Sequence, residues 1–104
     1  MERRHFKRIV FGVKAEIVVR GMSVHAVIED LSEAGVNIIT DPVEDISMLD
    51  QGTDIELKFQ PVDNEFMVLK GKIAWVRKAH PKSTICNVGI TLENPPWDTS
   101  GCFV

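Results

Sequence analysis

The sequence predicts an all-β fold, a small six-stranded antiparallel β-barrel that follows a flexible basic N-terminal leader. Six short segments alternate between apolar and polar residues or form continuous apolar runs, and turn residues separate them. No segment places apolar residues at the 3.6-residue spacing of an amphipathic helix. A closed barrel also pairs the edge strands that an open sheet of this length would leave exposed.

The first three predicted strands lie in the N-terminal half of the chain. Residues 11–20 alternate between apolar and polar side chains, which indicates a half-buried strand. A turn at Gly21 leads into a second alternation over residues 22–28. Residues 36–40 form an extended apolar run, which Asp41-Pro42 ends because proline cannot continue a hydrogen-bonded ladder.

The C-terminal half contains three further predicted strands, at residues 53–60, 66–77 and 84–92. The acidic segment 43–52 connects the two halves and has room for one short helical turn. Gly71 and Gly89 lie inside predicted strands, where glycine is typical of tight bends or bulges.

One domain accounts for all 104 residues: a leader at 1–9, a barrel at 10–93 and a tail at 94–104, in which Trp97 and Phe103 can cover one end of the barrel. The composition, 44% apolar and 26% charged, is typical of a globular protein. The chain has no apolar run of about 20 residues that could span a membrane. It also lacks the apolar segment of a secretory signal, so we expect a cytoplasmic protein with reduced thiols.

The basic residues are concentrated near the N-terminus. Six of the twelve Lys and Arg residues lie within the first twenty positions, although the net charge of the chain is −3. A small basic region on an acidic body suits a compact anion better than a long nucleic-acid backbone.

The first candidate binding motif is Arg4-x-x-x-Arg8, which Arg3 precedes. Arginine presents a planar fork that donates paired hydrogen bonds to phosphate oxygens or to O6 and N7 of guanine, and its flat face stacks on purines. A ligand that contains both phosphates and guanines would therefore suit this leader. The alternative is a solvated basic terminus without a ligand.

The second candidate motif is Asp30-x-Ser32-x-x-Gly35, between two predicted strands. Aspartate accepts hydrogen bonds, and guanine offers N1–H and its 2-amino group as adjacent donors on one edge. Serine adds a short donor and acceptor, and glycine permits close approach of the backbone. The alternative is an ordinary turn, in which Asp30 or Ser32 only caps its own backbone.

Together the two motifs resemble the signature of the PilZ domain family, RxxxR followed by [DN]xSxxG. Residues 71–77, GKIAWVR, and residues 88–90, VGI, are similar to the last two core strands of that family. The resemblance covers residues 3–92, although many PilZ domains end in a helix that the short tail here has no room to form.

The resemblance implies a barrel that binds the bacterial second messenger cyclic di-GMP. Carried over by position, Arg4 and Arg8 form a clamp over the ligand, and a barrel-surface platform for a guanine is formed by Asp30, Ser32 and Gly35. Family members with an extra arginine before RxxxR tend to hold two intercalated ligand molecules, and Arg3 occupies that position. Trp75 is a further candidate, which either stacks a base at the border of the site or packs inside the barrel.

The sequence favours a receptor without catalytic activity. The three histidines, at positions 5, 25 and 80, lie far apart, and no glycine-rich phosphate loop precedes a helix. Cys86 and Cys102 lack the spacing of a metal or redox pair, and no metal or cofactor other than the ligand is expected. We expect the ligand to order the leader and to alter the surface that contacts a separate, unidentified downstream protein.

Two other functions remain open at this stage. One is a PilZ-like adaptor that acts through protein contacts without a ligand. The other is a small barrel that binds single-stranded nucleic acid, which the seven aromatic residues and the basic cluster confined to the leader disfavour.

Overall fold

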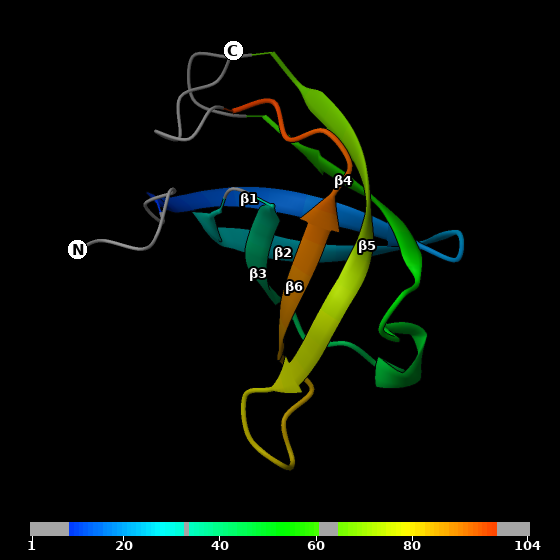
Figure 1. Cartoon of the computed structure of the whole chain (residues 1–104). Coiled ribbons are helices and arrows are strands. Elements are labelled where there is room, and N and C mark those ends of the chain that lie inside the picture. The colour runs from blue at the N-terminus through cyan, green and yellow to red at the C-terminus, as the bar shows by residue number, and fades with distance from the viewer. Residues whose placement is uncertain (1–8, 33, 61–64, 98–104) are drawn as a thin grey trace, which may run out of the picture.

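A computed structural model of the protein describes residues 9–32, 34–60 and 65–97, with side chains from Gly12 onward. It confirms the all-β prediction (Figure 1). The six strands are β1 (Ile9–Val19), β2 (Met22–Leu31), β3 (Gly35–Thr40), β4 (Asp54–Phe59), β5 (Met67–Lys78) and β6 (Cys86–Leu92). All neighbours are antiparallel in the order β1-β2-β3-β6-β5-β4, and pairing of β4 with β1 closes the barrel.

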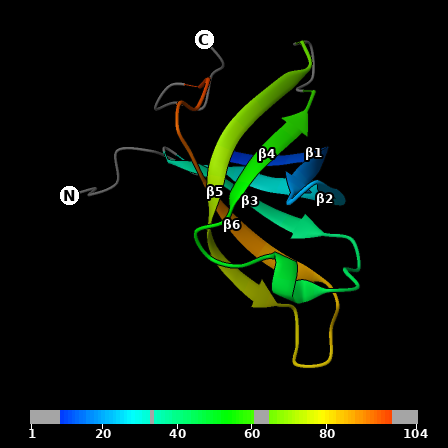
Figure 2. The same ribbon diagram turned by 90° about the vertical axis from the view of Figure 1, so that its right-hand side faces the viewer.

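The longest strand, β5, crosses the full height of the barrel (Figure 2). Its residues 67–72 pair with β4, and its residues 71–78 pair with β6. β5 therefore joins the β4 side of the barrel wall to the β6 side, and its residues 71–78 lie next to β6.

The barrel interior holds one hydrophobic core. Side chains that alternate along each strand point inward, and Ile17, Ile28, Leu57 and Val88 have no exposed surface. Trp97, from the segment after β6, packs against the same core and is 6% exposed. Phe103, the other tail residue expected to cover the barrel, lies outside the described residues. In the segments that the structure describes, no helix has the length and apolarity that a membrane span requires.

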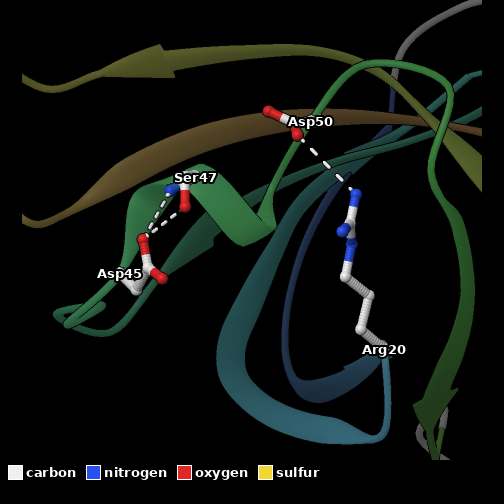
Figure 3. A network of polar contacts seen from close by, with 4 residues as sticks. All are labelled: Arg20, Asp45, Ser47 and Asp50. Carbon is white, nitrogen blue, oxygen red and sulfur yellow. Dashed lines mark hydrogen bonds and ion pairs between the residues drawn. The ribbon is translucent and has the colours of Figure 1, made fainter.

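The predicted turn at Gly21 lies at the start of β2, and the candidate motif from Asp30 to Gly35 lies at the other end of that strand. Arg20 and Gly21 have φ of 50° and 80°, as a two-residue type I′ hairpin requires. Arg20 forms an ion pair with Asp50 at 3.6 Å (Figure 3). Both side chains are mostly exposed, so the pair contributes at most about 1 kcal/mol.

The connection between β3 and β4 contains the short helical turn expected within residues 43–52, a 3₁₀ helix at Ile46–Met48. Asp45 caps its N-terminus, since the Ser47 N–H and hydroxyl both donate to Asp45 Oδ1 (Figure 3). These hydrogen bonds lower the pKa of the Asp45 carboxyl because they favour its charged form.

Strand boundaries differ slightly from prediction: β1 begins at Ile9, two residues early, and β6 begins at Cys86, two residues late. The β1 difference accompanies an irregularity in pairing with β2 between Val10 and Val13, where Gly12 has a φ of 68°. A glycine in this conformation lets the strand continue through a bulge toward its N-terminus.

Two single-residue bulges lie farther along the sheet. Glu29 is the extra residue of β2 opposite β3, and Ala74 is the extra residue of β5 opposite β6. Gly89 lies opposite the second bulge, in line with the expectation for that glycine. Gly71 does not lie at a bulge: it stays in regular register with both neighbouring strands, and a Cβ there would overlap the Thr91 carbonyl oxygen of β6.

We predict that Thr40→Val destabilises the barrel by about 1–3 kcal/mol, because it leaves a buried donor unpaired. Thr40 is 2% exposed, and its Oγ1 accepts the Cys86 N–H at 3.0 Å where the β3–β6 ladder ends. Chemical denaturation measures the change. Thr91→Val makes the same substitution at an exposed strand position and should stay within about 0.5 kcal/mol of wild type. Equal stability of the two variants would contradict this role for Thr40.

Candidate ligand-binding site

One row of residues crosses the outer face of four neighbouring strands. Asp30 of β2 lies opposite Asn37 of β3, Asn37 lies opposite Gly89 of β6, and Gly89 lies opposite Trp75 of β5. Directly opposed residues on one face of an antiparallel sheet have their Cβ positions about 4.5–5.5 Å apart. The row therefore brings an acidic group, an amide and an indole onto one continuous surface.

The turn between β2 and β3 closes one end of this surface. The Ser32 N–H donates to the Gly35 carbonyl at 2.8 Å, and the Gly35 N–H donates to the Ser32 carbonyl at 3.2 Å. The Ser32 hydroxyl also donates to the Gly35 carbonyl and accepts from the Gly35 N–H, both at 3.2 Å. The Ser32 hydroxyl thus forms its hydrogen bonds within its own turn, as expected if the motif is an ordinary turn.

The chain after β6 holds the same turn from outside. The Trp97 Nε1–H donates to the Ser32 carbonyl at 2.9 Å, and the Leu92 N–H donates to the Ala34 carbonyl at 2.9 Å. Trp97 is buried, so its hydrogen bond is shielded from water. The turn is therefore fixed to the barrel on both sides.

Glycine is required at position 35 because β6 passes directly over it. A Cβ at this position would overlap the carbonyl group of Ile90. Backbone cannot move aside as a flexible side chain can, so any larger residue would push β3 and β6 apart. The close approach sets the shape of the surface next to the turn.

The indole of Trp75 lies over Gly89, where a Cβ would overlap the Nε1 edge of the ring. Trp75 is 38% exposed and does not belong to the core, so the alternative of packing inside the barrel is wrong for this residue. The Arg77 guanidinium lies 5.2 Å from the centre of the indole, a cation–π arrangement. An aromatic face and a cation thus meet at the border of the row.

These residues surround a hollow of about 210 Å³, lined by Asp30, Ser32, Ala34, Gly35, Val36, Asn37, Ala74, Trp75, Gly89, Ile90 and Thr91. Pockets that enclose a drug-sized ligand start at roughly 300 Å³, so this hollow suits a single base rather than a whole dinucleotide. A larger hollow of about 480 Å³ beside Gln51 and Leu92 contains none of the predicted site residues.

The structure brings four of the predicted site residues together, since Asp30, Ser32, Gly35 and Trp75 all line this hollow. The other three, Arg3, Arg4 and Arg8, lie outside the described residues. The start of β1, which follows their segment, lies beside the end of β2 (Figure 1). There Ile9 pairs with Leu31 and Val10 pairs with Asp30. The chain therefore enters β1 directly beside the hollow.

Sequence reasoning missed two residues of this surface, Asn37 and Arg77. Each lies two positions after a predicted site residue on the same strand, Gly35 and Trp75, and alternate residues of a strand share a face. This two-residue periodicity was the sequence signal that could have identified both residues. Asn37 Oδ1 is buried and has no hydrogen-bond partner within the described part of the chain, a property that it shares with Asn87 Oδ1.

The described residues include no group of three or more His, Cys, Asp or Glu side chains that could hold a metal ion. Burial raises the pKa of the Cys86 thiol, which has no exposed surface. A raised pKa keeps the sulfur protonated at neutral pH and therefore a poor nucleophile or metal ligand. What the hollow offers chemically is hydrogen bonding and stacking.

Comparison with family models finds a match to the PilZ domain over residues 2–99 of the chain. The matched range includes both motifs, all six strands and Trp97. A search of curated proteins found no match.

We predict that Gly89→Ala displaces the Trp75 indole, because the added methyl group occupies its position. Tryptophan emission should shift to longer wavelength and be quenched more readily by acrylamide. The unfolding free energy should fall by about 1–3 kcal/mol, as expected for overpacking. In the Trp75→Phe background the only remaining tryptophan is the buried Trp97, so Gly89→Ala should leave the emission unchanged. An unaltered emission spectrum in the single variant would contradict this packing.

Proposed function

Because the chain belongs to the PilZ domain family, a family of cyclic di-GMP-binding receptors, we propose that it is itself a receptor for cyclic di-GMP. The observation that carries the proposal is the shared hollow of Asp30, Gly35 and Trp75 next to the start of β1. Residues 45 positions apart in the sequence meet there, and the arginine-rich segment joins the barrel at the same place.

The barrel surface supplies the guanine platform in this proposal. The Asp30 carboxylate accepts from N1–H and the 2-amino group of a guanine, since both donors lie on one edge of the base. Trp75 stacks on the base or on its neighbour. Ser32 contributes by holding the turn, because its hydroxyl already bonds to Gly35.

The leader supplies the phosphate contacts. A hollow of about 210 Å³ accommodates one base, so the phosphates and the second base need further partners. Arg8 immediately precedes Ile9, which pairs beside the Asp30–Leu31 end of β2. We assign Arg4 and Arg8 to the phosphates and to guanine O6 and N7, where their planar forks form charge-assisted hydrogen bonds.

Ligand binding then orders the leader against the barrel, because the phosphates neutralise its clustered positive charge. The covered surface differs from the ligand-free one, and a separate protein senses that difference. Arg3 adds a third arginine to the clamp, which supports an intercalated pair of cyclic di-GMP molecules. PilZ domains are binding and adaptor domains rather than enzymes, and the function proposed here is binding alone.

We predict that the double substitution Arg4→Ala, Arg8→Ala weakens cyclic di-GMP binding by about 100-fold or more. Each charge-assisted hydrogen bond is worth about 1.5–3 kcal/mol, so two arginines account for at least this loss. Calorimetric titration measures both affinity and stoichiometry. We expect two ligands per chain for wild type and one for Arg3→Ala.

Arg20→Ala is the matched control, since Arg20 is an exposed arginine at the opposite end of β2 and pairs with Asp50. This variant should bind as wild type does. A double variant at positions 4 and 8 that binds cyclic di-GMP as tightly as wild type would rule out the proposed clamp.

A further inference from the structure

We propose that Asn37 determines specificity for guanine by accepting a hydrogen bond from its 2-amino group. The inference rests on the proposed function and extends the site by a residue that lies outside both sequence motifs. It is carried by two properties of Asn37: its position in the row beside Asp30, and its side-chain oxygen, to which no described group donates.

Asn37 occupies the middle of the row across the site. Its backbone lies in register with Asp30 on one side and with Gly89 on the other, and its side chain lines the hollow. Trp75 covers Gly89, so Asn37 lies between the proposed guanine acceptor and the stacking ring. A base held by Asp30 and extending toward Trp75 must pass over Asn37.

The Asn37 amide has an unmet hydrogen bond in this fold. Its Oδ1 is buried, and no group in the described segments donates to it. An unpaired buried polar atom costs about 1–3 kcal/mol, and a donor on a ligand would remove this cost where the residue also lines a hollow. The side chain as a whole is half-buried and Asn37 lines the hollow, and in this proposal rotation about the broad χ2 torsion turns the oxygen toward the base.

Guanine carries the donor that this oxygen lacks. A carboxylate that bonds to the base edge accepts from N1–H and from one N–H of the 2-amino group, which leaves the second N–H of that group without a partner. Asn37, the neighbour of Asp30 in the row, is the residue placed to accept it. The Ser32 hydroxyl is already engaged with Gly35 and offers no equivalent acceptor.

The arrangement discriminates against adenine. Adenine has no 2-amino group, and its N1 is an acceptor that would face the Asp30 carboxylate. Hypoxanthine, the base of inosine, keeps N1–H and O6 but lacks the 2-amino group. A cyclic dinucleotide of inosine therefore removes the 2-amino group, with its hydrogen bonds to Asp30 and Asn37, and leaves N1–H and O6 in place.

The test is calorimetric titration of the full chain with cyclic di-GMP and with cyclic di-IMP, for wild type and for Asn37→Leu. Wild type should bind cyclic di-IMP about 100-fold more weakly than cyclic di-GMP, because cyclic di-IMP loses the hydrogen bonds of the 2-amino group to both Asp30 and Asn37. Asn37→Leu should bind cyclic di-GMP about tenfold more weakly than wild type. The variant should prefer cyclic di-GMP over cyclic di-IMP by only about tenfold, because the 2-amino group still donates to Asp30.

Asn87→Leu is the matched control. Asn87 carries the other buried, unpaired side-chain oxygen in the described residues, but it lies opposite Ile39 and Arg77 and does not line the hollow. This variant should keep wild-type affinity and the wild-type preference for cyclic di-GMP. Both substitutions remove an unpaired oxygen, so neither should lower the melting temperature, and weaker binding by Asn37→Leu cannot then result from unfolding.

The two proposals fail in different ways. If wild type binds cyclic di-GMP and Asn37→Leu retains the full wild-type preference over cyclic di-IMP, the role of Asn37 is overturned and the receptor function stands. If wild type does not bind cyclic di-GMP, both proposals are overturned.

Discussion

The site depends on a geometric constraint: side chains of a β-strand alternate between its two faces, so one inserted residue exchanges the faces of all that follow. Along β2, Ile28 points into the core, and strict alternation would also point Asp30 inward. The bulge at Glu29 turns Asp30 outward and returns Leu31 to the core, where it has no exposed surface. Without this inserted residue, the carboxylate would lie in the hydrophobic interior.

A second bulge, at Ala74 of β5, likewise turns a side chain outward at the other end of the row. Ile73 of β5 is buried, and the extra residue Ala74 turns Trp75 outward onto Gly89. Two independent insertions on non-adjacent strands thus produce one row of outward-facing groups. The glycine opposite Trp75 leaves space for the indole, and the glycine at position 35 leaves space for β6. The residues between them then form a shallow hollow on an otherwise continuous barrel wall.

Alternation and turn residues were sufficient to predict the fold from the sequence. Ile17, Ile28 and Leu57 fall on the apolar faces of their segments, and all three are fully buried. The bulges could not be predicted in the same way, because Glu29 and Ala74 have no turn or glycine signature. The facing of Trp75 could therefore not be predicted from the sequence, and only the β5–β6 register shows that it points outward.

Asn37 illustrates the other limit of prediction. It lies on β3, two residues beyond the second motif, and its significance comes from pairing with Asp30 and Gly89 rather than from its place in the chain. The pairing of β3 with β6 joins strands that are not consecutive in sequence. A local pattern carries no information on such a contact. Its buried oxygen has no donor among the described residues, and in the proposed complex the 2-amino group of guanine supplies one.

The central claim is that cyclic di-GMP binds on the row from Asp30 to Trp75 and is covered by the N-terminal arginines. Titration of ¹⁵N-labelled protein with cyclic di-GMP, followed through backbone amide and indole resonances, tests it most directly. The account predicts large shifts for residues 3–8, for residues 30–37, for Gly89 and for the Trp75 indole. Resonances of Arg20, Gly21 and residues 46–50 at the opposite end of the barrel should stay in place. Shifts confined to that opposite end, or no shifts at saturating ligand, would contradict the account.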